Sequence, residues 1–461
     1  MQIKHAIGVI GTGYVGLVTA ACFAHLGVHV HGVDTDVDKI AGLNNHIMPI
    51  YEQDLAPLVA EGKASGKLVF SSDLARMLQE VDTVFIAVGT PTQAKTGGAD
   101  LSYLQAVAKA LGPLLQAHRY LVIKSTVPVG TSVQFTQWLK EANPSARFTM
   151  VSNPEFLREG LAVSDFLNPD RILIGVETEA GLSHMQDLYK PLSEKGIPVL
   201  CTNIVSAELI KYAANGFLAT KIAFINEMAS LCDKVGANIE HVVAGIGSDK
   251  RIGPGYLQPG PGFGGSCFPK DTLALQSMGQ AAGMPLSVIE GVVASNIRHK
   301  QRMVENIVKV LGPNLAHKRL SIWGLAFKAG TDDIRESASI DIIKALLTAG
   351  AVLRVFDPVV TKGKFDLSVL DDARDNAHRL MHASSCEESM EDTEAVIIVT
   401  EWPCFKFVDW NLFKRTHDRV VRVIDFRNLY DPIKMAQSGI AYVSLGRPAV
   451  HPATVYGYEY A

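Results

Sequence analysis

The glycine-rich stretch GTGYVG, residues 11–16, constrains the fold of this chain more than any other feature. It follows the apolar run HAIGVIG, opens the helical pattern TGYVGLVTAACFAHLG, and is followed by a second apolar run, VHVHGVD. Gly11, Gly13 and Gly16 permit a tight turn, close approach of a pyrophosphate and close packing of helix on strand. A strand, glycine turn, helix and strand in this order predict a βαβ unit that binds a dinucleotide at the helix N-terminus.

Asp34, at the end of the second apolar run, specifies the dinucleotide further. A carboxylate at this distance from the glycines can bind a ribose diol, and it would repel the 2′-phosphate of NADP. We therefore predict NAD as the cofactor, while the nearby Lys39 leaves NADP as the alternative. Tyr14 and Val15, inside the glycine turn, are predicted to contact the cofactor as well.

Alternating apolar runs and helical patterns occupy most of the chain. The runs DTVFIAVGTP, RYLVIKSTVP and RFTMVSNPEF follow the first unit, and RLSIWGLAF, AVLRVFDP, EAVIIVT and RVVRVIDF come after a largely helical middle. This alternation predicts parallel sheets. We expect two Rossmann-like, doubly wound α/β domains joined by a long helix near Asn203–Val235. The expected limits are 1–200 for the NAD-binding domain, 201–310 for a central helical domain and 311–461 for a C-terminal domain.

Composition excludes several classes of protein. A net charge of −4 over 461 residues argues against nucleic acid as the main partner. The six cysteines are scattered, with no CxxC pair and no spacing suited to disulfides or zinc, which favours a reducing cytoplasm and predicts no metal. Glycines interrupt the apolar N-terminal run as a strand and helix require, so we predict neither an export signal nor a membrane span.

Three further stretches contain candidate catalytic residues. GPGFGGSCFPKD, residues 260–271, places one cysteine in a glycine-rich loop; it is either a nucleophile or an inert thiol in an ordinary turn. KSTVPVGT and NPEFLREG follow strands, where loops line the ligand crevice of a parallel sheet. Glu155 and Glu159 would share one face if their segment were helical. Lys211 and Asn215, four apart on the long helix, point into one polar pocket, unless the lysine faces solvent.

In these motifs the chain resembles the nucleotide-sugar 6-dehydrogenases of the UDP-glucose/GDP-mannose dehydrogenase family. The resemblance extends to four further stretches: VGTPT, AELIKYAANGFLATKIAFINE, GLAFKAGTDDIRES and DFRN. The resemblance covers nearly the whole chain except residues 370–392. It implies oxidation of a sugar C6 alcohol to a carboxylate with reduction of two NAD. The members it resembles most convert UDP-glucose to UDP-glucuronate, a step of nucleotide-sugar metabolism that supplies polysaccharide synthesis.

The resemblance also implies roles for individual residues. Cys267 would add to the aldehyde as a thiolate, giving a thiohemiacetal that can lose hydride and a thioester that water cleaves. Asp271 would act as a base or orient water, and Lys211 with Asn215 would hold the developing alkoxide. Glu155 and Thr126 would assist thioester hydrolysis.

The binding residues implied by the resemblance fall into two sets. Further cofactor contacts are expected from Thr90, Pro91, Thr126, Glu159 and Arg335. Substrate contacts are expected from Glu155, Phe156, Leu157, Lys211, Asn215, Arg251, Tyr256, Leu257, Phe263, Gly264, Phe327, Lys328 and Arg427. Arg251 would reach the site of a neighbouring subunit. The long helix and the resemblance to the family together predict at least a homodimer built on that helix.

Three alternatives differ from this hypothesis in defined ways. A GDP-mannose or UDP-N-acetylhexosamine 6-dehydrogenase would share the chemistry and differ in substrate. A two-electron hydroxyacid dehydrogenase of the 6-phosphogluconate type would share the first domain and the long helix but would not need Cys267. A non-catalytic NAD-binding protein would be expected to lack some of the catalytic residues.

Overall fold

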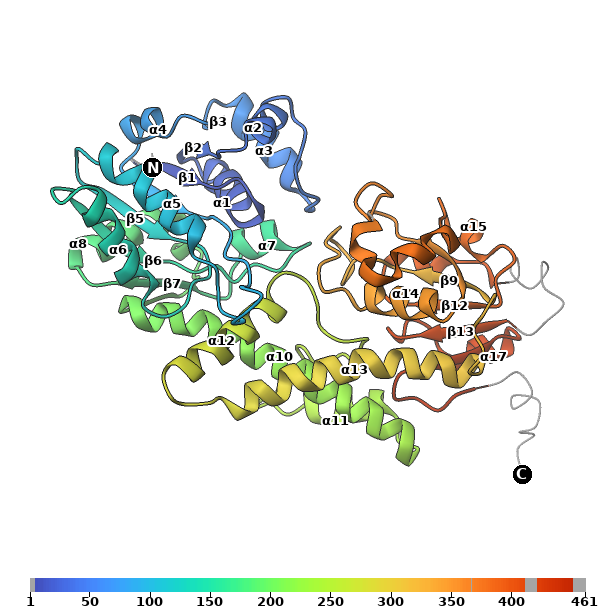
Figure 1. The fold of residues 1–461 in the computed structure, drawn as a ribbon. Helices are drawn as coiled ribbons and strands as arrows, with labels where there is room; N and C mark the ends of the chain where they lie inside the picture. The colour runs from blue at the N-terminus through green and yellow to red at the C-terminus, as the bar shows by residue number, and fades with distance from the viewer. Residues whose placement is uncertain (1–4, 366, 411–420, 451–461) are drawn as a thin grey trace. The chain divides into compact units, whose positions relative to one another are not determined.

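The structure, a computed structural model, describes residues 5–365, 367–410 and 421–450 (Figure 1). The chain divides into two compact units. Unit 1 comprises residues 1–214 and 273–285, and unit 2 comprises residues 215–272 and 286–461. Two helices contribute residues to both units: α10 (Ile204–Val235) and α12 (Phe268–Ala281). Gly216, which interrupts the apolar pattern of α10 in the sequence, lies inside this continuous helix.

Unit 1 contains a sheet with the order β3-β2-β1-β4-β5-β6-β7-β8. Its strands are β1 (Ala6–Ile10), β2 (His29–Val33), β3 (Leu68–Ser71), β4 (Thr83–Ile86), β5 (Arg119–Ile123), β6 (Phe148–Ser152), β7 (Ile172–Val176) and β8 (Val199–Thr202). The first six are parallel, in the strand order of dinucleotide-binding domains. β7 runs antiparallel to β6, and β8 is parallel to β7, so two strands extend this sheet beyond the predicted unit.

Helices cover both faces of this sheet. They are α1 (Tyr14–His25), α2 (Val37–Asn44), α3 (Leu55–Ala64), α4 (Leu74–Glu80), α5 (Ser102–Leu111), α6 (Thr131–Ala142), α7 (Ala162–Leu167), α8 (Glu179–Leu188) and α9 (Lys190–Ser193). Helices α1, α3, α7 and α8 bury one apolar cluster against the sheet, and α4, α5 and α6 bury another. Phe23 of α1 lies at the centre of the first cluster, with its ring 5.2–5.4 Å from three other aromatic rings.

Unit 2 contains a wholly parallel sheet with the order β11-β10-β9-β12-β13-β14. Its strands are β9 (Arg319–Trp323), β10 (Val352–Phe356), β11 (Leu380–His382), β12 (Ala395–Ile398), β13 (Arg422–Asp425) and β14 (Ala441–Ser444). Among the described residues, its further helices are α11 (Ile239–Gly247), α13 (Ser287–Leu311), α14 (Ala338–Thr348), η2 (Leu367–Arg379), α15 (Cys386–Met390), η3 (Pro403–Phe407) and α17 (Pro432–Gln437). The stacked rings of Trp323 and Trp410 mark its core.

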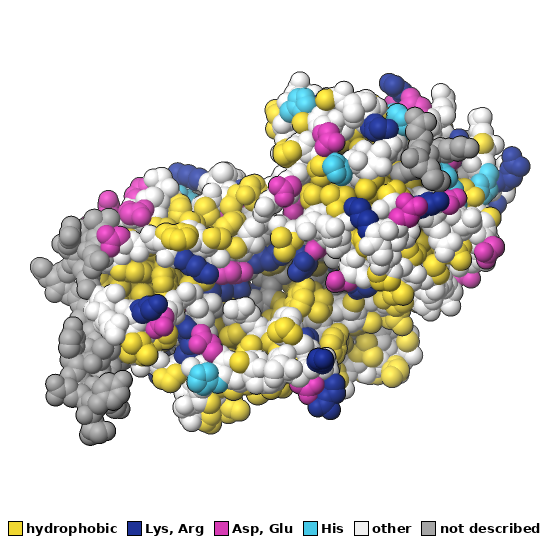
Figure 2. Space-filling view, turned by 180° about the vertical axis from the view of Figure 1, so that it is seen from behind, with side chains coloured by type: hydrophobic (Ala, Val, Ile, Leu, Met, Phe, Trp, Pro, Cys, Tyr) yellow, Lys and Arg dark blue, Asp and Glu magenta, His cyan; other side chains and the backbone are white. Residues whose placement is uncertain are grey.

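The predicted fold class is confirmed: unit 1 contains a mostly parallel and unit 2 a parallel α/β sheet, and the long helix α10 contributes residues to both units. Acidic and basic side chains are interspersed over the face in Figure 2, as the small net charge leads one to expect. Among the described residues, no helix is long and apolar enough to cross a membrane. The limits of the three predicted domains stay a prediction.

Candidate active site

The glycine turn between β1 and α1 has the geometry that a pyrophosphate requires. Gly11 adopts φ +93°, and a side chain on Gly16 would place its Cβ 1.8 Å from the Gly11 carbonyl oxygen. Gly13 is the N-cap residue of α1, and a Cβ placed there would meet nothing within 4 Å. Without a capping side chain, the first amides of α1 are available to an anion. This cradle fits the diphosphate of NAD.

Asp34 lies at the end of β2 and is held by several donors. Its Oδ2 accepts hydrogen bonds of 2.8 Å from both the amide and the hydroxyl of Thr12, and it lies 3.1 Å from Lys39 Nζ. Partial burial alone would raise the pKa of Asp34, but the hydrogen bonds from Thr12, Asp36 and Lys39 outweigh it and lower that pKa. The carboxylate is therefore ionised at neutral pH, as binding of a ribose diol requires.

The other expected cofactor residues of unit 1 follow the ends of neighbouring strands. Thr90, beyond β4, donates a 2.9 Å hydrogen bond to the carbonyl of Thr126, beyond β5. Pro91 is exposed, whereas Glu159, beyond β6, is buried. Arg335 belongs to unit 2, where its guanidinium binds the Asp333 carboxylate at 2.6 Å.

The loop after β6 contains the first catalytic candidate, Glu155. Residues 153–158 are not helical, so the four-residue spacing of Glu155 and Glu159 does not place them on one helix face. Glu155 Oε1 lies 3.2 Å from Nζ of Lys211 on α10, and both side chains are at most 5% exposed. The Phe156 ring centroid lies 5.2 Å from the same ammonium. The lysine of the long helix is thus buried in an ion pair and does not face solvent.

A second lysine, Lys124, lies close to this pair at the end of β5. Its Nζ donates a 3.0 Å hydrogen bond to Asn153 Oδ1, which also accepts a 2.6 Å hydrogen bond from the Tyr189 hydroxyl. Burial lowers the pKa of Lys124 to about 8; the charge of Lys211 lowers it too, while that of Glu155 opposes the change.

Unit 2 contains the cysteine and its immediate neighbours. Cys267 is partly exposed and directly precedes α12, whose N-terminus favours a negative charge on a thiolate. Asp271, one turn into α12, donates its amide to the Cys267 carbonyl at 2.8 Å. Its buried carboxylate accepts a 2.6 Å hydrogen bond from Asn215 Nδ2 and lies 2.5 Å from Lys270 Nζ. The Asp271 carboxylate is therefore held by two donors, four residues after Cys267.

Side chains of α10 and α13 hold the loop that leads to Cys267. Asn226 Oδ1 accepts the Gly260 amide at 2.9 Å, and His299 Nε2 lies 2.7 Å from the Gly260 carbonyl. Asn296 binds both the amide and the carbonyl of Phe263, at 2.9 and 3.0 Å. These side chains therefore hold the backbone of the loop at Gly260 and at Phe263.

The dense glycines of this loop also permit close packing within unit 2. A Cβ on Gly264 would lie 2.3 Å from the Glu336 carbonyl oxygen, and one on Gly265 would lie 2.7 Å from the Phe327 ring. The Glu336 carbonyl and the Phe327 ring, both in the GLAFKAGTDDIRES motif, therefore occupy the space that side chains on these glycines would need. The sequence explained these glycines by close approach of a ligand, whereas at Gly264 and Gly265 the close approach is to the protein itself.

The expected substrate residues of unit 2 form two groups. Arg427 donates from Nη2 to the Phe327 carbonyl at 2.7 Å, and Lys328 Nζ lies 5.7 Å from the Phe327 ring centroid. Tyr256 and Phe263 place their rings 6.1 and 6.2 Å from that of Phe268, and Leu257 is buried. Arg251 stands apart: its side chain is 89% exposed and pairs with Asp249.

Comparison with known proteins identifies the family. The UDP-glucose/GDP-mannose dehydrogenase family is matched by its NAD binding domain over residues 5–193, its central domain over 205–298 and its UDP binding domain over 321–432. The chain belongs to the UDP-glucose/GDP-mannose dehydrogenase family. The resemblance read from the sequence, and with it the prediction of an NAD-binding dehydrogenase, is confirmed.

Individual members of the family are similar over nearly the whole chain. The UDP-glucose 6-dehydrogenase of Rhizobium meliloti (strain 1021) is 43% identical over 96% of this chain and 99% of its own length. A UDP-glucose dehydrogenase structure from Pyrobaculum islandicum is 37% identical with a TM-score of 0.83, covering 92% of this chain and 94% of its own. A UDP-D-ManNAc dehydrogenase structure from Pyrococcus horikoshii is 25% identical with a TM-score of 0.82, covering 96% and 99%.

Two residues that contact these family motifs escaped the sequence analysis. Glu52, just before α3, accepts hydrogen bonds from the Tyr14 hydroxyl and from the amides of Gly160 and Ala162, so it joins the glycine-turn helix to the NPEFLREG loop. Burial and this carboxylate raise the pKa of Tyr14. Lys270, which binds Asp271, is the other. Lys270 could have been noticed from its place in FPKD, whereas no local signal marks Glu52.

Proposed function

We propose that this chain is a UDP-glucose 6-dehydrogenase, which oxidises UDP-glucose to UDP-glucuronate in the cytoplasm. The observation that carries the proposal is the arrangement of Cys267 at the start of α12 with Asp271 held by Asn215 and Lys270. An alcohol-to-ketone oxidation needs no nucleophile, whereas an aldehyde can lose hydride only after a nucleophile has added to it, and a thiolate can be that nucleophile. The six free thiols, all among the described residues, support a reducing compartment.

When bound, NAD would accept a hydride in each of the two oxidations. The glycine turn and Asp34 would hold it, and further contacts would come from Thr90, Pro91, Glu159 and Arg335. The chain's own residues perform the rest of the chemistry. In the first oxidation the C6 hydroxyl loses its proton to water or a carboxylate, and the Lys211 ammonium and the Asn215 amide stabilise the alkoxide. The product of this step is the C6 aldehyde.

Cys267 acts on that aldehyde. Its sulfur forms a bond to C6, and the carbonyl oxygen becomes the thiohemiacetal oxygen, stabilised by the same donors. Loss of the remaining hydride from C6 gives a thioester on Cys267. Water, oriented by Thr126 and activated by Glu155 or Asp271, then adds to the thioester carbon, and the carbon–sulfur bond breaks to release the carboxylate and the thiolate.

Similarity to relatives favours UDP-glucose over the alternative sugars. The chain is 43% and 37% identical to two proteins named for UDP-glucose but 25% identical to one named for UDP-D-ManNAc. We propose that the domain matched over residues 321–432 and the loop after α11 bind the nucleotide sugar, and that residues 1–200, 201–310 and 311–461 are the functional domains.

We also propose a homodimer built on α10. Ile210, Phe217, Phe224 and Leu231 recur every seventh residue on this helix and are 37–66% exposed, which is unusual for large apolar side chains on one stripe. The exposure of Arg251 supports a role in the site of a neighbouring subunit. Sedimentation should give at least a dimer, and F217D/F224D should dissociate it; a fully active monomer of the unsubstituted chain would overturn this proposal.

The variant C267S tests the mechanism. We expect it to lose UDP-glucuronate formation by at least about a thousandfold, because serine cannot replace the thiolate at neutral pH. Binding of UDP-glucose, measured by calorimetry, should change by no more than a few-fold. C404S, at an exposed cysteine, is the matched control and should keep full activity. Ordinary turnover by C267S would remove Cys267 from the mechanism.

A further inference from the structure

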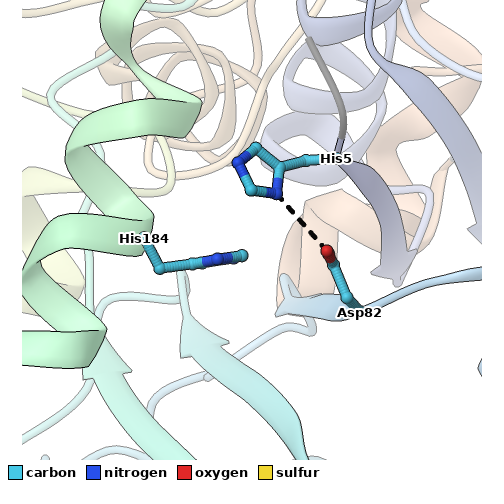
Figure 3. Close-up of side chains that lie close together, drawn as sticks. All are labelled: His5, Asp82 and His184. Carbon is cyan, nitrogen blue, oxygen red and sulfur yellow. Dashed lines mark hydrogen bonds and ion pairs between the residues drawn. The ribbon is translucent and has the colours of Figure 1, made fainter.

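Two histidines and an aspartate converge at the edge of the unit 1 sheet opposite the glycine turn (Figure 3). His5 directly precedes β1 and Asp82 directly precedes β4, so both lie where these parallel strands begin. His184 lies on α8 and extends toward the same space. The glycine turn and Asp34, in contrast, follow the ends of β1 and β2. This cluster is therefore separate from the proposed cofactor site.

The three donor atoms lie within 4.8 Å of one another. His5 Nδ1 is 3.3 Å from Asp82 Oδ2, and the rings of His5 and His184 are 4.5 Å apart. The Thr83 hydroxyl lies 2.7 Å from both Asp82 Oδ1 and His184 Nε2, so it keeps these two side chains together. The His184 ring is stacked on Tyr120 at 3.6 Å, which fixes its orientation.

Burial and charge make this cluster unlike an ordinary surface ion pair. His184 is 9% exposed, whereas the Asp82 side chain is 46% exposed, so a small ion can enter from the aspartate side. The carboxylates of Asp82 and Asp187 and the imidazoles of His5 and His118 surround His184.

We propose that His5, Asp82 and His184 bind one divalent transition-metal cation of the Zn²⁺ or Co²⁺ type. Two imidazole nitrogens and a carboxylate oxygen are ligands that these ions prefer, and solvent would complete the coordination. At the tetrahedral angle, metal–ligand bonds of about 2.1 Å place two ligand atoms about 3.4 Å apart. The donor atoms, which lie within 4.8 Å of one another, must therefore close by up to about 1.4 Å, and the partly exposed Asp82 can move toward the histidines. Binding would cross-link α8 to the starts of β1 and β4.

The test is a titration of the metal-free, full-length protein with Co²⁺, followed by visible absorption. We expect one Co²⁺ per chain with d–d bands typical of nitrogen and oxygen ligands, without the thiolate charge-transfer band that binding at a cysteine would give. Added Zn²⁺ should displace it. H5N and D82N should each weaken Co²⁺ binding by at least about tenfold.

The control variant is H25N. His25 Nδ1 is also 3.3 Å from a carboxylate, that of Glu61, but among the described residues no third donor joins this pair. H25N should therefore bind Co²⁺ like the unsubstituted protein. His5 and Asp82 are partly exposed, so their variants should fold, which circular dichroism checks, whereas loss of the stacked His184 ring risks unfolding. Absence of the nitrogen–oxygen spectrum, or equal affinity in H5N, D82N and the unsubstituted protein, would overturn the proposal.

Discussion

Removing one partner of the buried ion pair between Glu155 and Lys211 should be among the most destabilising point substitutions in unit 1. The oxygen and nitrogen are 3.2 Å apart, and the side chains are 5% and 3% exposed. At an effective dielectric constant of about 20, two unit charges at this distance attract by about 5 kcal/mol. Much of this attraction offsets the cost of removing both charges from water, so the pair itself adds little net stability.

Removing one partner leaves that cost uncompensated. We expect E155Q and K211M each to lower the free energy of unfolding of unit 1 by about 3–5 kcal/mol, because each removes the opposite charge 3.2 Å from the buried charge that remains. The double variant E155Q/K211M buries no charge at this position. It should be more stable than the sum of the single effects implies, with a coupling energy of about 3 kcal/mol.

Trp138 allows this measurement to be confined to unit 1. It lies on α6 and is the only one of the chain's four tryptophans in that unit. Urea unfolding followed by ¹⁹F NMR of fluorotryptophan-labelled protein therefore reports unit 1 through a single resonance. The control is K190M, which removes an exposed pair 4.0 Å apart in the same unit and should cost no more than about 0.5 kcal/mol. A coupling energy below about 0.5 kcal/mol would refute the reasoning.

Three further outcomes are expected. D34A should lower the preference for NAD over NADP at least about tenfold in kcat/KM, because the repelling carboxylate is gone; an unchanged ratio would contradict this. H299A should lower kcat/KM for UDP-glucose about tenfold by releasing the Gly260 carbonyl, and H299Q, which can still donate, should restore most of it; equal losses would contradict the positioning role. Between pH 8 and 10.5 an unfolded chain keeps the proton that folded Lys124 has lost, so this residue makes the free energy of unfolding rise with pH. The free energy of unfolding of the unsubstituted protein, minus that of K124M, should therefore grow by up to about 3 kcal/mol across that range. If urea unfolding gave the same difference at every pH, the lowered pKa would be contradicted.

Much of the fold could be predicted because its signals are local. The order of apolar run, glycine turn and helix identifies the βαβ unit at residues 6–33, and the unbroken apolar pattern identifies α10. The antiparallel strand β7 was not predicted. Its sequence, RILIGV, has the same apolar pattern as a parallel buried strand. Its direction is set by pairing with β6, which forms only when the chain folds.

In the candidate site, too, the residues could be predicted from local motifs, whereas their contacts could not. Cys267, Asp271, Lys211, Asn215 and Glu155 were all expected from motifs, but their pairing was not. The four-residue spacing suggested one shared pocket for Lys211 and Asn215, whereas the former binds Glu155 and the latter binds Asp271. Such pairs join segments 56 residues apart, so they depend on tertiary structure that spacing along one helix does not reveal.

Contacts between distant segments explain the remaining omissions. Glu52 lies 108 residues from the Gly160 amide that it binds, and His5 lies 77 residues from Asp82. Neither residue belongs to a pattern with a chemical meaning of its own. Their environment arises only when parallel strands bring several loops to one edge of the sheet.

The yield of NADH from limiting UDP-glucose tests the central claim most directly. The purified protein is given excess NAD and a measured amount of UDP-glucose, beside GDP-mannose and UDP-N-acetylhexosamines, and the sugar product is identified by mass. A role for Cys267 in a second oxidation requires about two NADH per UDP-glucose, with UDP-glucuronate as product. A yield of about one NADH, with an aldehyde or ketone as product, would contradict the proposed function.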